Sequence, residues 1–460
     1  MESFIPMLNS IDSIVWGPPL IALLVGTGIY LTVRLGLIQV FRLPLALSLI
    51  LGAKNRGEGD VSSFKSLCVA LSATVGTGNI VGVATAVKVG GPGALFWMWM
   101  AAFFGMATKY AEGLLAIKYR SKDENGEVAG GPMYYILNGM GEAWRPLATF
   151  FAAACILVAY FGIGTFPQVN AIVDSVHLTF GISKFVTDAV LTVLVAAVTL
   201  GGLKSIANVA DKVVPFMSAV YVVLGVGMII AHLGDIPAAV GMILTDAFTG
   251  QAAVGGFAGS TMMMAMQSGI ARGVFSNESG LGSAPIAAAA AKTKEPAEQG
   301  LISMTGTFID TLIICTMTGL ALVLTGVWQG DAAGAAMTSA AFASAYGVLG
   351  SSLLTIALVL FAFTTILGWN YYGERACIYL FGTKGVMPYR IIFIALIASG
   401  GFLKLEAIWI LADIVNGLMA IPNLIALIAL SGVVVAETES YLARKGDLDE
   451  DSDSNMVAEH

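Results

Sequence analysis

The chain has 460 residues, of which 57% are hydrophobic and only 12% are charged. A soluble globular chain typically has about 25% charged residues, so this charge is too sparse to solvate an ordinary soluble surface. The composition excludes a disordered chain, a disulfide scaffold and an ordinary cytosolic enzyme. It predicts an all-α polytopic membrane protein, because about 20 apolar residues cross the hydrocarbon as one helix.

Eleven hydrophobic segments are expected to cross the membrane. In chain order they span 14–36, 64–88, 93–118, 147–173, 185–203, 212–232, 252–291, 298–326, 349–380, 388–403 and 406–435. The seventh segment is too long for one straight crossing, which predicts a break within it. The small, polar-dotted stretch 331–346 is expected to be an extracellular loop or a short surface helix.

Lysine and arginine residues predict the orientation, because cytoplasmic loops are enriched in both. They gather on one face of the eleven crossings, at Arg42, Lys54, Arg56, Lys65, Lys118, Arg120, Lys122, Arg145, Lys204, Lys212, Lys292, Lys294, Lys384, Arg390, Arg444 and Lys445. We therefore expect a multi-pass protein of the plasma (inner) membrane, with the N-terminus outside and the C-terminus in the cytoplasm. We expect the protein to be embedded in the lipid bilayer. The sequence has no basic surface that would bind nucleic acid.

Two segments are interrupted by glycines and polar residues. Segment two contains Ser72–Gly82, and segment seven contains Gln267–Gly280. Each glycine in a helix interior costs about 1 kcal/mol relative to alanine, so these stretches are poor continuous helices. One explanation is close helix packing through small residues. The other is a helix that unwinds at mid-membrane depth, which is tolerated only where the backbone lines a protein cavity.

The position of the interruptions favours unwound helices. Segment two opens a run of five crossings and segment seven opens the next five, so the second run is inverted relative to the first. Glycine-interrupted segments in matching places of two inverted halves are the best sequence indicator of a transporter binding site. The expected division is an extracellular N-terminus with an extra transmembrane helix (1–36), a cytoplasmic connection (37–63), two five-helix repeats (64–235 and 236–435) and an acidic, disordered cytoplasmic tail (436–460).

Four motifs carry a family resemblance, namely Ala73–Ile80, Gly130–Tyr135, Phe275–Pro285 and Thr364–Trp369. The chain resembles the alanine/glycine:cation symporter family, of the amino acid–polyamine–organocation superfamily, from about Gly59 to Leu430. The resemblance implies a LeuT-type 5+5 inverted repeat, here preceded by one extra helix. It also implies import of alanine or glycine with a co-transported sodium ion, or less often a proton, by alternating access. We expect a functional monomer.

A small zwitterion needs one site for its carboxylate and another for its ammonium group. The second half-helix of segment two would start near Thr77, where the N–H groups of Thr77, Gly78 and Asn79 offer an anion site. Carbonyls near Gln267 and Ser268, at the expected end of the first half of segment seven, would accept hydrogen bonds from the ammonium group. Further candidates for the substrate cavity are Phe166, Gln168, Gly269, Ile270 and Trp369.

Two of these candidates have a simpler alternative reading. Trp369 would wall the cavity and limit the substrate to a small side chain, or it would belong to the aromatic belt at the membrane interface. Gln168 follows Pro167, so a local distortion would expose backbone there, whereas the alternative is an ordinary interhelical hydrogen bond.

By resemblance to the LeuT-type ion site, the carbonyls of Ser72 and Val75 and the hydroxyls of Thr364 and Thr365 would bind sodium. The alternative for both threonines is a hydrogen bond back to a carbonyl of their own helix.

Charged residues inside apolar segments are costly and need partners. Arg272 is expected to form a buried or gating pair with Asp310 or Glu278, and the alternative is that Asp310 carries a proton or helps to bind the cation. Lys109 and Glu112 are three residues apart and are expected to pair locally.

Other classes of function find little support in the sequence. A dinucleotide loop at Gly76–Gly82 would need a preceding strand and a βαβ unit. A membrane enzyme would need a cluster of catalytic groups, and the sequence has no His/Cys/Glu cluster and no nucleophile elbow. An exchanger, a uniporter or a channel remains the alternative to a symporter.

Overall fold

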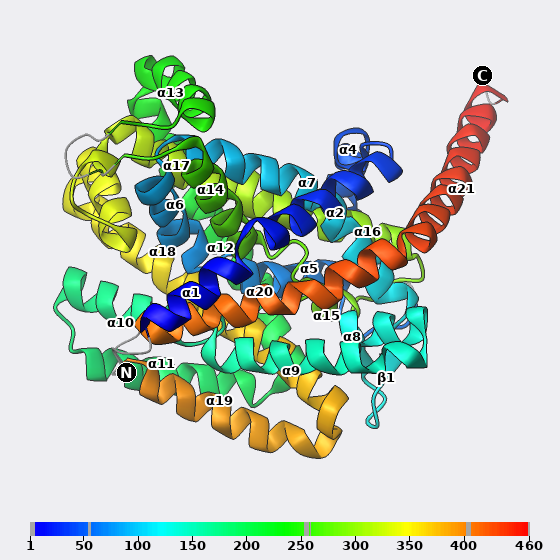
Figure 1. Ribbon diagram of the computed structural model, residues 1–460. Coiled ribbons are helices and arrows are strands. Elements are labelled where there is room, and N and C mark those ends of the chain that lie inside the picture. Colours follow the sequence, from blue (N-terminus) through cyan, green and yellow to red (C-terminus); the bar gives the residue numbers. More distant parts are fainter. Residues whose placement is uncertain (1–4, 54–56, 253–256, 258, 402–405, 459–460) are drawn as a thin grey trace.

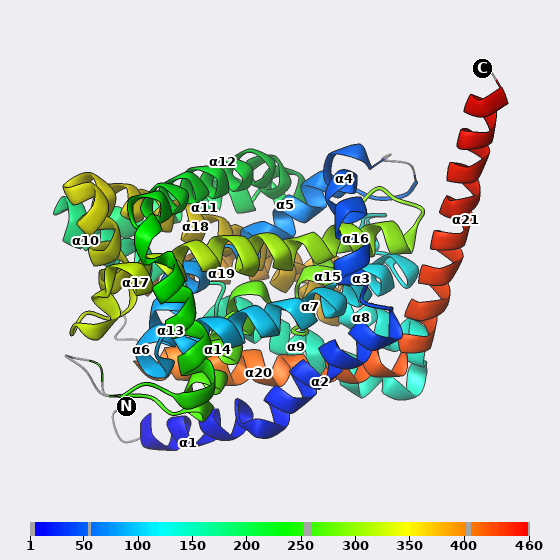
Figure 2. The same ribbon diagram turned by 90° about the horizontal axis from the view of Figure 1, so that it is seen from above.

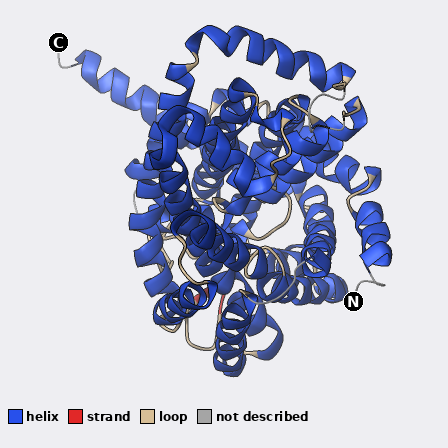
Figure 3. Cartoon of the chain, turned by 90° about the vertical axis from the view of Figure 1, so that its left-hand side faces the viewer, coloured by secondary structure: helices blue, strands red, loops and turns tan. Residues whose placement is uncertain are grey.

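The computed structural model of the protein describes residues 5–53, 57–252, 257, 259–401 and 406–458. The described chain is almost entirely helical, and its long helices run side by side in one bundle (Figures 1 and 3). Parts of the predicted N-terminus, first connection, segments seven and ten, and tail lie outside the described residues. The first described helix begins at one end of the bundle, and the last helix projects from the opposite end (Figures 1 and 2).

The first part of the chain contains an N-terminal pair of helices and the first interrupted helix. Its elements are α1 (Ile5–Val15), α2 (Pro18–Arg34), α3 (Ile38–Phe41), α4 (Leu43–Gly52), α5 (Ser63–Thr74), the π-helical turn η2 (Gly78–Gly82), α6 (Val83–Gly90) and α7 (Gly93–Lys118). Ser62 caps α5 by accepting a hydrogen bond from the backbone N–H of Lys65 at 3.2 Å, which satisfies one of its unpaired donors. Segment two is broken where the sequence predicts, because α5 ends at Thr74 and η2 begins only at Gly78.

The next part contains a short hairpin and four long helices. Its elements are β1 (Ser121–Lys122), β2 (Val128–Ala129), α8 (Pro132–Tyr135), η3 (Ile136–Met140), η4 (Glu142–Trp144), α9 (Arg145–Phe161), α10 (Phe166–Phe180), α11 (Lys184–Thr199) and α12 (Gly202–Ala231). Segment four is thus two helices, α9 and α10. Pro167 lies in the first turn of α10, where its missing N–H costs nothing, and it favours a new start after Phe161.

The second half contains the other interrupted helix. Its elements are η5 (Leu233–Asp235), α13 (Ile236–Thr249), α14 (Met262–Asn277), α15 (Ala284–Ala288), α16 (Pro296–Thr307), η6 (Phe308–Cys315), α17 (Thr316–Thr325), η7 (Val327–Gln329), α18 (Gly334–Phe381), η8 (Thr383–Gly385), α19 (Val386–Gly400), α20 (Glu406–Ala429) and α21 (Ser431–Ala458). Helix α18 is kinked at Gly347, where φ is 60°. The part of α18 before this kink is helical, in the stretch that the sequence predicts as a loop or surface helix.

The number of membrane crossings differs from the number of continuous helices. Within the described residues, five helices are long and apolar enough to cross a membrane, or seven if each of two bent pairs counts as one span. One of these pairs is α5 with η2 and α6, bent by 49°. The predicted eleven segments are thus not reproduced as eleven continuous helices, because breaks divide several of them into shorter pieces.

The acidic tail does not begin as a disordered segment. Helix α21 continues through the predicted boundary at residue 436, and Val434, Thr438 and Tyr441 are buried on it. These residues recur at helical spacing, so they present one face to the bundle. An ion pair of 2.6 Å between Glu437 and Lys118 adds a further contact. The expectation of disorder was wrong for this first part, because sparse apolar residues at the right spacing suffice to dock it.

Helix α7 lies in the interior and is packed closely by α14 and α16, which small residues permit (Figure 2). A Cβ built on Gly269 of α14 would lie 2.3 Å from the carbonyl oxygen of Ala94 on α7, and a Cβ on Gly113 would lie 2.4 Å from the hydroxyl of Ser303 on α16. Such approaches are possible only where one partner lacks a side chain. Gly269 therefore serves helix packing.

Gly269→Ala is expected to lower the free energy of unfolding by about 1–3 kcal/mol, because the added methyl group overpacks a backbone contact. Gly26→Ala on α2 is the matched control, since a methyl group added to Gly26 would meet no other atom within 4 Å. Thermal unfolding of the detergent-purified protein measures both. Equal melting temperatures for the two variants would contradict the packing role of Gly269.

Candidate functional site

The two interrupted helices meet in the interior of the bundle. The first break lies between the end of α5 at Thr74 and the start of η2 at Gly78. The second lies between the end of α14 at Asn277 and the start of α15 at Ala284. A Cβ on Gly78 would lie only 3.0 Å from the Cα atom of Ser276. Glycine at 78 thus allows the backbones beside the two breaks to touch.

The free backbone N–H groups of the first break donate hydrogen bonds to side-chain amide oxygens. The N–H of Gly76 donates to Oδ1 of Asn79 at 2.8 Å, and the N–H of Thr77 donates to Oε1 of Gln168 at 3.3 Å. Gln168 in turn donates to the carbonyl of Ile163, in the gap between α9 and α10, at 2.9 Å. The hydroxyl of Thr77 is buried and has no hydrogen-bond partner among the described residues. The structure therefore brings Gln168 to the predicted anion site.

Asp310 connects the two interrupted helices. Its Oδ1 accepts a hydrogen bond from the amide of Asn79 at 2.7 Å, and its Oδ2 accepts from the hydroxyls of Ser276 at 2.9 Å and Thr311 at 2.8 Å. The residue is fully buried on the π-helical turn η6. One carboxylate thus holds a donor from η2 and a donor from α14, so the relative position of the breaks depends on it.

The predicted cation ligands are brought together only in part. The hydroxyl of Thr365 lies 3.4 Å from the carbonyl oxygen of Val75 at the first break, and it also donates to the carbonyl of Phe361 at 3.0 Å. The hydroxyl of Thr364 instead bonds the carbonyls of Leu360 and Phe361 in its own helix. The alternative, a bond back to the residue's own helix, thus accounts for Thr364, and it also holds for Thr365 through Phe361. Thr365 and Val75 supply hard oxygen atoms of the type that alkali cations prefer.

Ser72 contributes to this region through its backbone. Its hydroxyl donates to the carbonyl of Val69 at 2.7 Å, so the side chain is occupied within α5. Its carbonyl belongs to the last turn of α5, where carbonyl groups lack partners within the helix. The predicted role of Ser72 as a carbonyl ligand is therefore compatible with its place at the end of α5.

Trp369 lies in the interior and not at the membrane interface. Its side chain is fully buried, and its Nε1–H donates to Oε1 of Glu278 at 2.8 Å. The other carboxylate oxygen of Glu278 accepts a hydrogen bond from Ser283 at 2.5 Å. A Cβ on Gly164 would lie 2.6 Å from the Cβ atom of Trp369. Trp369 thus joins α18 to the second break and abuts the gap between α9 and α10.

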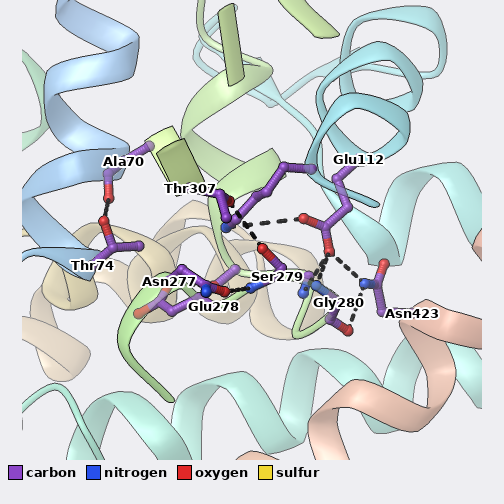
Figure 4. A network of polar contacts seen from close by, with 12 residues as sticks. Ala70, Thr74, Glu112, Asn277, Glu278, Ser279, Gly280, Thr307 and Asn423 are labelled. Carbon is purple, nitrogen blue, oxygen red and sulfur yellow. Dashed lines mark hydrogen bonds and ion pairs between the residues drawn. The ribbon is translucent and has the colours of Figure 1, made fainter. Parts of the chain in front are cut away.

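A second buried carboxylate holds the backbone of the second break. Oε1 of Glu112 on α7 accepts hydrogen bonds from the N–H groups of Gly280 at 3.1 Å and Gly282 at 3.2 Å, and from the amide of Asn423 at 2.7 Å. Figure 4 shows Glu112 pointing at this turn, with Asn423 on its other side. Lys109 lies 4.0 Å from Oε2 of Glu112, so the predicted local pair is present.

The second break lies further along the chain than predicted. Gln267, Ser268, Gly269 and Ile270 are within α14, which Thr261 caps at its start. The carbonyls of Gln267 and Ser268 therefore lie in the helix interior, which contradicts the ammonium site expected there. Ser268 instead donates to the carbonyl of Ala86 on α6 at 3.1 Å.

The backbone of the second break turns at residues that adopt left-handed conformations with positive φ. Glu278 has φ of 55°, and Gly280 and Gly282 have φ of 86° and 81°. Glycine adopts a positive φ at no steric cost. Gly269 and Gly273 have no such role, because they lie inside helix α14. The useful sequence signal was the pair Gly280 and Gly282 before Pro285, and not Gly269.

Two other predicted residues have different neighbours from those expected. Arg272 forms an ion pair with Asp413 of α20 at 2.9 Å and not with Asp310 or Glu278. The oxygens of those two carboxylates are already occupied by uncharged donors, so they need no guanidinium group. Phe166 packs against Gly400 of α19 and stacks with Phe161, so its ring lies on the α19 side of α10.

Several residues of this network were absent from the predicted site. Ser276 and Asn277 fall inside the motif Phe275–Pro285, and Asn277 donates to Thr311 at 3.0 Å while accepting from the N–H of Ser279 at 2.9 Å. Glu112 was predicted only to pair with Lys109, although its charge inside an apolar segment indicates a wider role. Asn423, which follows Pro422 in α20, has no distinctive sequence signal.

Comparison with known proteins finds similarity along nearly the whole chain. A sequence profile described as the Sodium:alanine symporter family matches residues 1–455. The chain is 58% identical over 440 residues to an uncharacterised transporter of Haemophilus influenzae, covering 95% of this chain and 96% of the relative. It is 49% identical over 449 residues to the sodium/alanine symporter AgcS of Methanococcus maripaludis, covering 95% and 97%.

Solved structures show the same kind of fold at low sequence identity. The transporter MhsT in complex with L-phenylalanine superimposes with a TM-score of 0.58 and 13% identity, covering 83% of this chain and 93% of that chain. The manganese transporter of Eremococcus coleocola gives a TM-score of 0.51, also at 13% identity, covering 81% and 78%. The likeness shows a LeuT-type transporter fold.

Trp369→Phe is expected to lower the free energy of unfolding by about 1–3 kcal/mol, because it leaves a buried oxygen of Glu278 without its donor. The control is Trp144→Phe, since Trp144 is 42% exposed. Chemical denaturation monitored by the remaining tryptophans compares the two variants with the parent protein. An effect of Trp369→Phe no larger than that of the control would contradict the importance of this hydrogen bond.

Proposed function

The chain belongs to the sodium:alanine symporter family, and on this premise we propose that it imports alanine and glycine together with sodium by alternating access. The family consists of transporters and not of enzymes. Membership makes the chain a sodium-coupled amino acid symporter and a multi-pass membrane protein. The particular amino acids, the ion site and the topology are the substance of the proposal.

The observation that carries the proposal is the meeting of two broken helices around donors and acceptors suited to a zwitterion. The substrate carboxylate would bind at the N–H groups of Gly76 and Thr77, where the positive end of a half-helix favours an anion. It would replace the amide oxygens of Asn79 and Gln168, which occupy these donors. The hydroxyl of Thr77, buried without a partner among the described residues, would be a further donor.

Sodium would bind beside the carboxylate. We assign the carbonyls of Val75 and Ser72 and the hydroxyl of Thr365 to this ion, because the hydroxyl already lies at the Val75 carbonyl. Thr364 would join them only by rotating away from the carbonyls of its own helix. Binding of ion and substrate to the same break would stabilise the closed state more than either does alone, and this differential affinity couples the two fluxes.

The buried charges favour a cation in this interior. Glu112, Glu278 and Asp310 are each fully buried, whereas Lys109 is the nearest buried ammonium group. An interior with excess negative charge attracts cations. We propose that the bonds of Asp310 and Glu278 also act in gating, because both carboxylates join elements that must separate when the site opens.

A small substrate side chain follows from the close packing around the first break. A Cβ on Gly76 would lie 2.3 Å from the hydroxyl of Thr365, and Trp369 fills the space between α18 and the second break. Little room is left for a large side chain, which favours alanine and glycine. A relative named a probable sodium/glutamine symporter, GlnT of Bacillus subtilis, is 36% identical to this chain, so competition between amino acids is the informative measurement.

We propose eleven crossings, in two inverted five-helix repeats after an extra first helix, with the N-terminus outside and the C-terminus in the cytoplasm. The arrangement of the ends supports this. The start of α1 and helix α13 lie at one end of the bundle, whereas α4, β1 and α21 lie at the other (Figure 1). We also propose that a monomer suffices for transport, because contacts within one chain bring the two breaks together.

Uptake of labelled alanine by proteoliposomes tests the function. An inward sodium gradient is expected to drive saturable accumulation, which unlabelled glycine competes with more strongly than glutamine. Uptake that depends on a proton gradient alone would overturn sodium coupling. Saturable flux indifferent to both gradients would indicate an exchanger or a uniporter, and flux that does not saturate would indicate a channel.

Thr365→Val is expected to raise the sodium concentration for half-maximal uptake by about tenfold, the equivalent of about 1.4 kcal/mol, because the hydroxyl ligand is lost at similar volume. Thr365→Ser keeps the hydroxyl and is the matched control. Sodium-dependent alanine uptake gives the value for each variant, and Thr364→Ala should have the smaller effect. Unchanged sodium dependence in Thr365→Val would remove Thr365 from the ion site.

A further inference from the structure

Lys109 and Glu112 lie one helical turn apart on α7, deep in the bundle and beside the second break. Their side chains are 3% and 0% exposed. Glu112 uses one oxygen for three hydrogen bonds, whereas its other oxygen faces the Lys109 ammonium group at 4.0 Å. The nitrogen of Lys109 has no hydrogen-bond partner among the described residues. Its interaction with the protein is therefore mainly electrostatic.

The second break depends on this carboxylate. An unwound segment at membrane depth has backbone N–H groups that must find acceptors inside the protein. At this break, two such groups, those of Gly280 and Gly282, share the same oxygen of Glu112. Hydrogen bonds to an ionised acceptor are about twice as strong as those between neutral groups. The turn is consequently held best when Glu112 is ionised.

An ionised carboxylate in a dry interior needs a compensating positive charge. The Lys109 ammonium group lies 4.0 Å away, on the same helix. It also lines a small cavity together with Thr74 at the first break and Asn277 at the second. Figure 4 shows Thr74 and Asn277 on the side of the network away from Asn423. Lys109 is thus placed between the two interrupted helices.

We propose that Lys109 and Glu112 are positioning residues for transport, in which Lys109 acts as a fixed internal cation that keeps Glu112 ionised and the second break in shape. The inference rests on the proposed function and extends it to residues outside the substrate and sodium sites. The effect reaches the site through a short chain of contacts. Glu112 holds Gly280 and Gly282, and these flank the turn after Glu278, whose carboxylate binds Trp369.

The charges of the pair predict a distinctive pattern among variants. Removing one partner of a buried ion pair leaves an uncompensated charge, which is strongly destabilising, whereas replacing both partners by neutral groups of similar size is often tolerated. Lys109→Met leaves Glu112 uncompensated, and Glu112→Gln leaves Lys109 uncompensated. In the double variant, the amide oxygen of the new glutamine can still accept from the two glycine N–H groups.

The experiment measures sodium-driven alanine uptake by proteoliposomes, normalised to folded protein, for the two single variants and the double variant. Each single variant is expected to raise the KM for alanine by about tenfold or more, with a smaller change in maximal rate, because removal of one partner distorts the break. The double variant is expected to recover most of this loss. Single effects that simply add in the double variant would overturn the pairing.

The control uses another lysine–glutamate pair that involves the same helix. Lys118 and Glu437 are 2.6 Å apart, and their side chains are 40% and 28% exposed. Their neutral double variant, Lys118→Met with Glu437→Gln, should leave KM unchanged, because exposed pairs contribute little.

A purely structural role gives a different result. It would reduce the amount of folded protein while the folded fraction kept the KM of the parent, and this outcome would overturn the inference. If a single variant does not fold, recovery of folding and of transport in the double variant supports the pair, and failure of both contradicts it. Absence of sodium-driven uptake in the parent protein would instead refute the proposed function.

Discussion

Backbone groups inside a membrane protein must form their hydrogen bonds within the protein, and both breaks of this molecule exist under that constraint. Each break is stabilised by at least one side chain from another helix. At the first, Asn79 and Gln168 accept from the freed N–H groups. At the second, Glu112 does so. The polar residues of the interior are therefore part of the fold as much as of the site.

The same bonds join elements that are distant in the sequence. Asp310 on η6 binds donors from both interrupted helices, and Trp369 on α18 binds Glu278 at the second break. A movement of either break must therefore strain bonds to at least one other helix. This coupling is the physical basis on which a change at the substrate site could reach the ends of the bundle. The same bonds offset part of the cost of burying these carboxylates.

The accuracy of the sequence predictions differed between the two breaks. The first was placed correctly, because several glycines lie close together between good helical stretches around Gly76. The second was placed about two to three turns too early, because Gly269 allows close packing on α7 and does not end the helix. The interior position of Trp369 was one of two alternatives, since tryptophans are also enriched at the membrane interface. The partner of Arg272 was predicted wrongly.

The sequence by itself determined the class of protein, its helical character, the place of the first break and the family, because these depend on composition, local periodicity and long motifs. Only the tertiary structure decided which polar groups meet. Glu112 and Asn423 are 311 residues apart, and Trp369 and Glu278 are 91 apart. Nothing in local periodicity states which helix faces which, since partners are selected by the packing of whole helices against one another. The identity of each polar partner is thus a property of the assembled bundle.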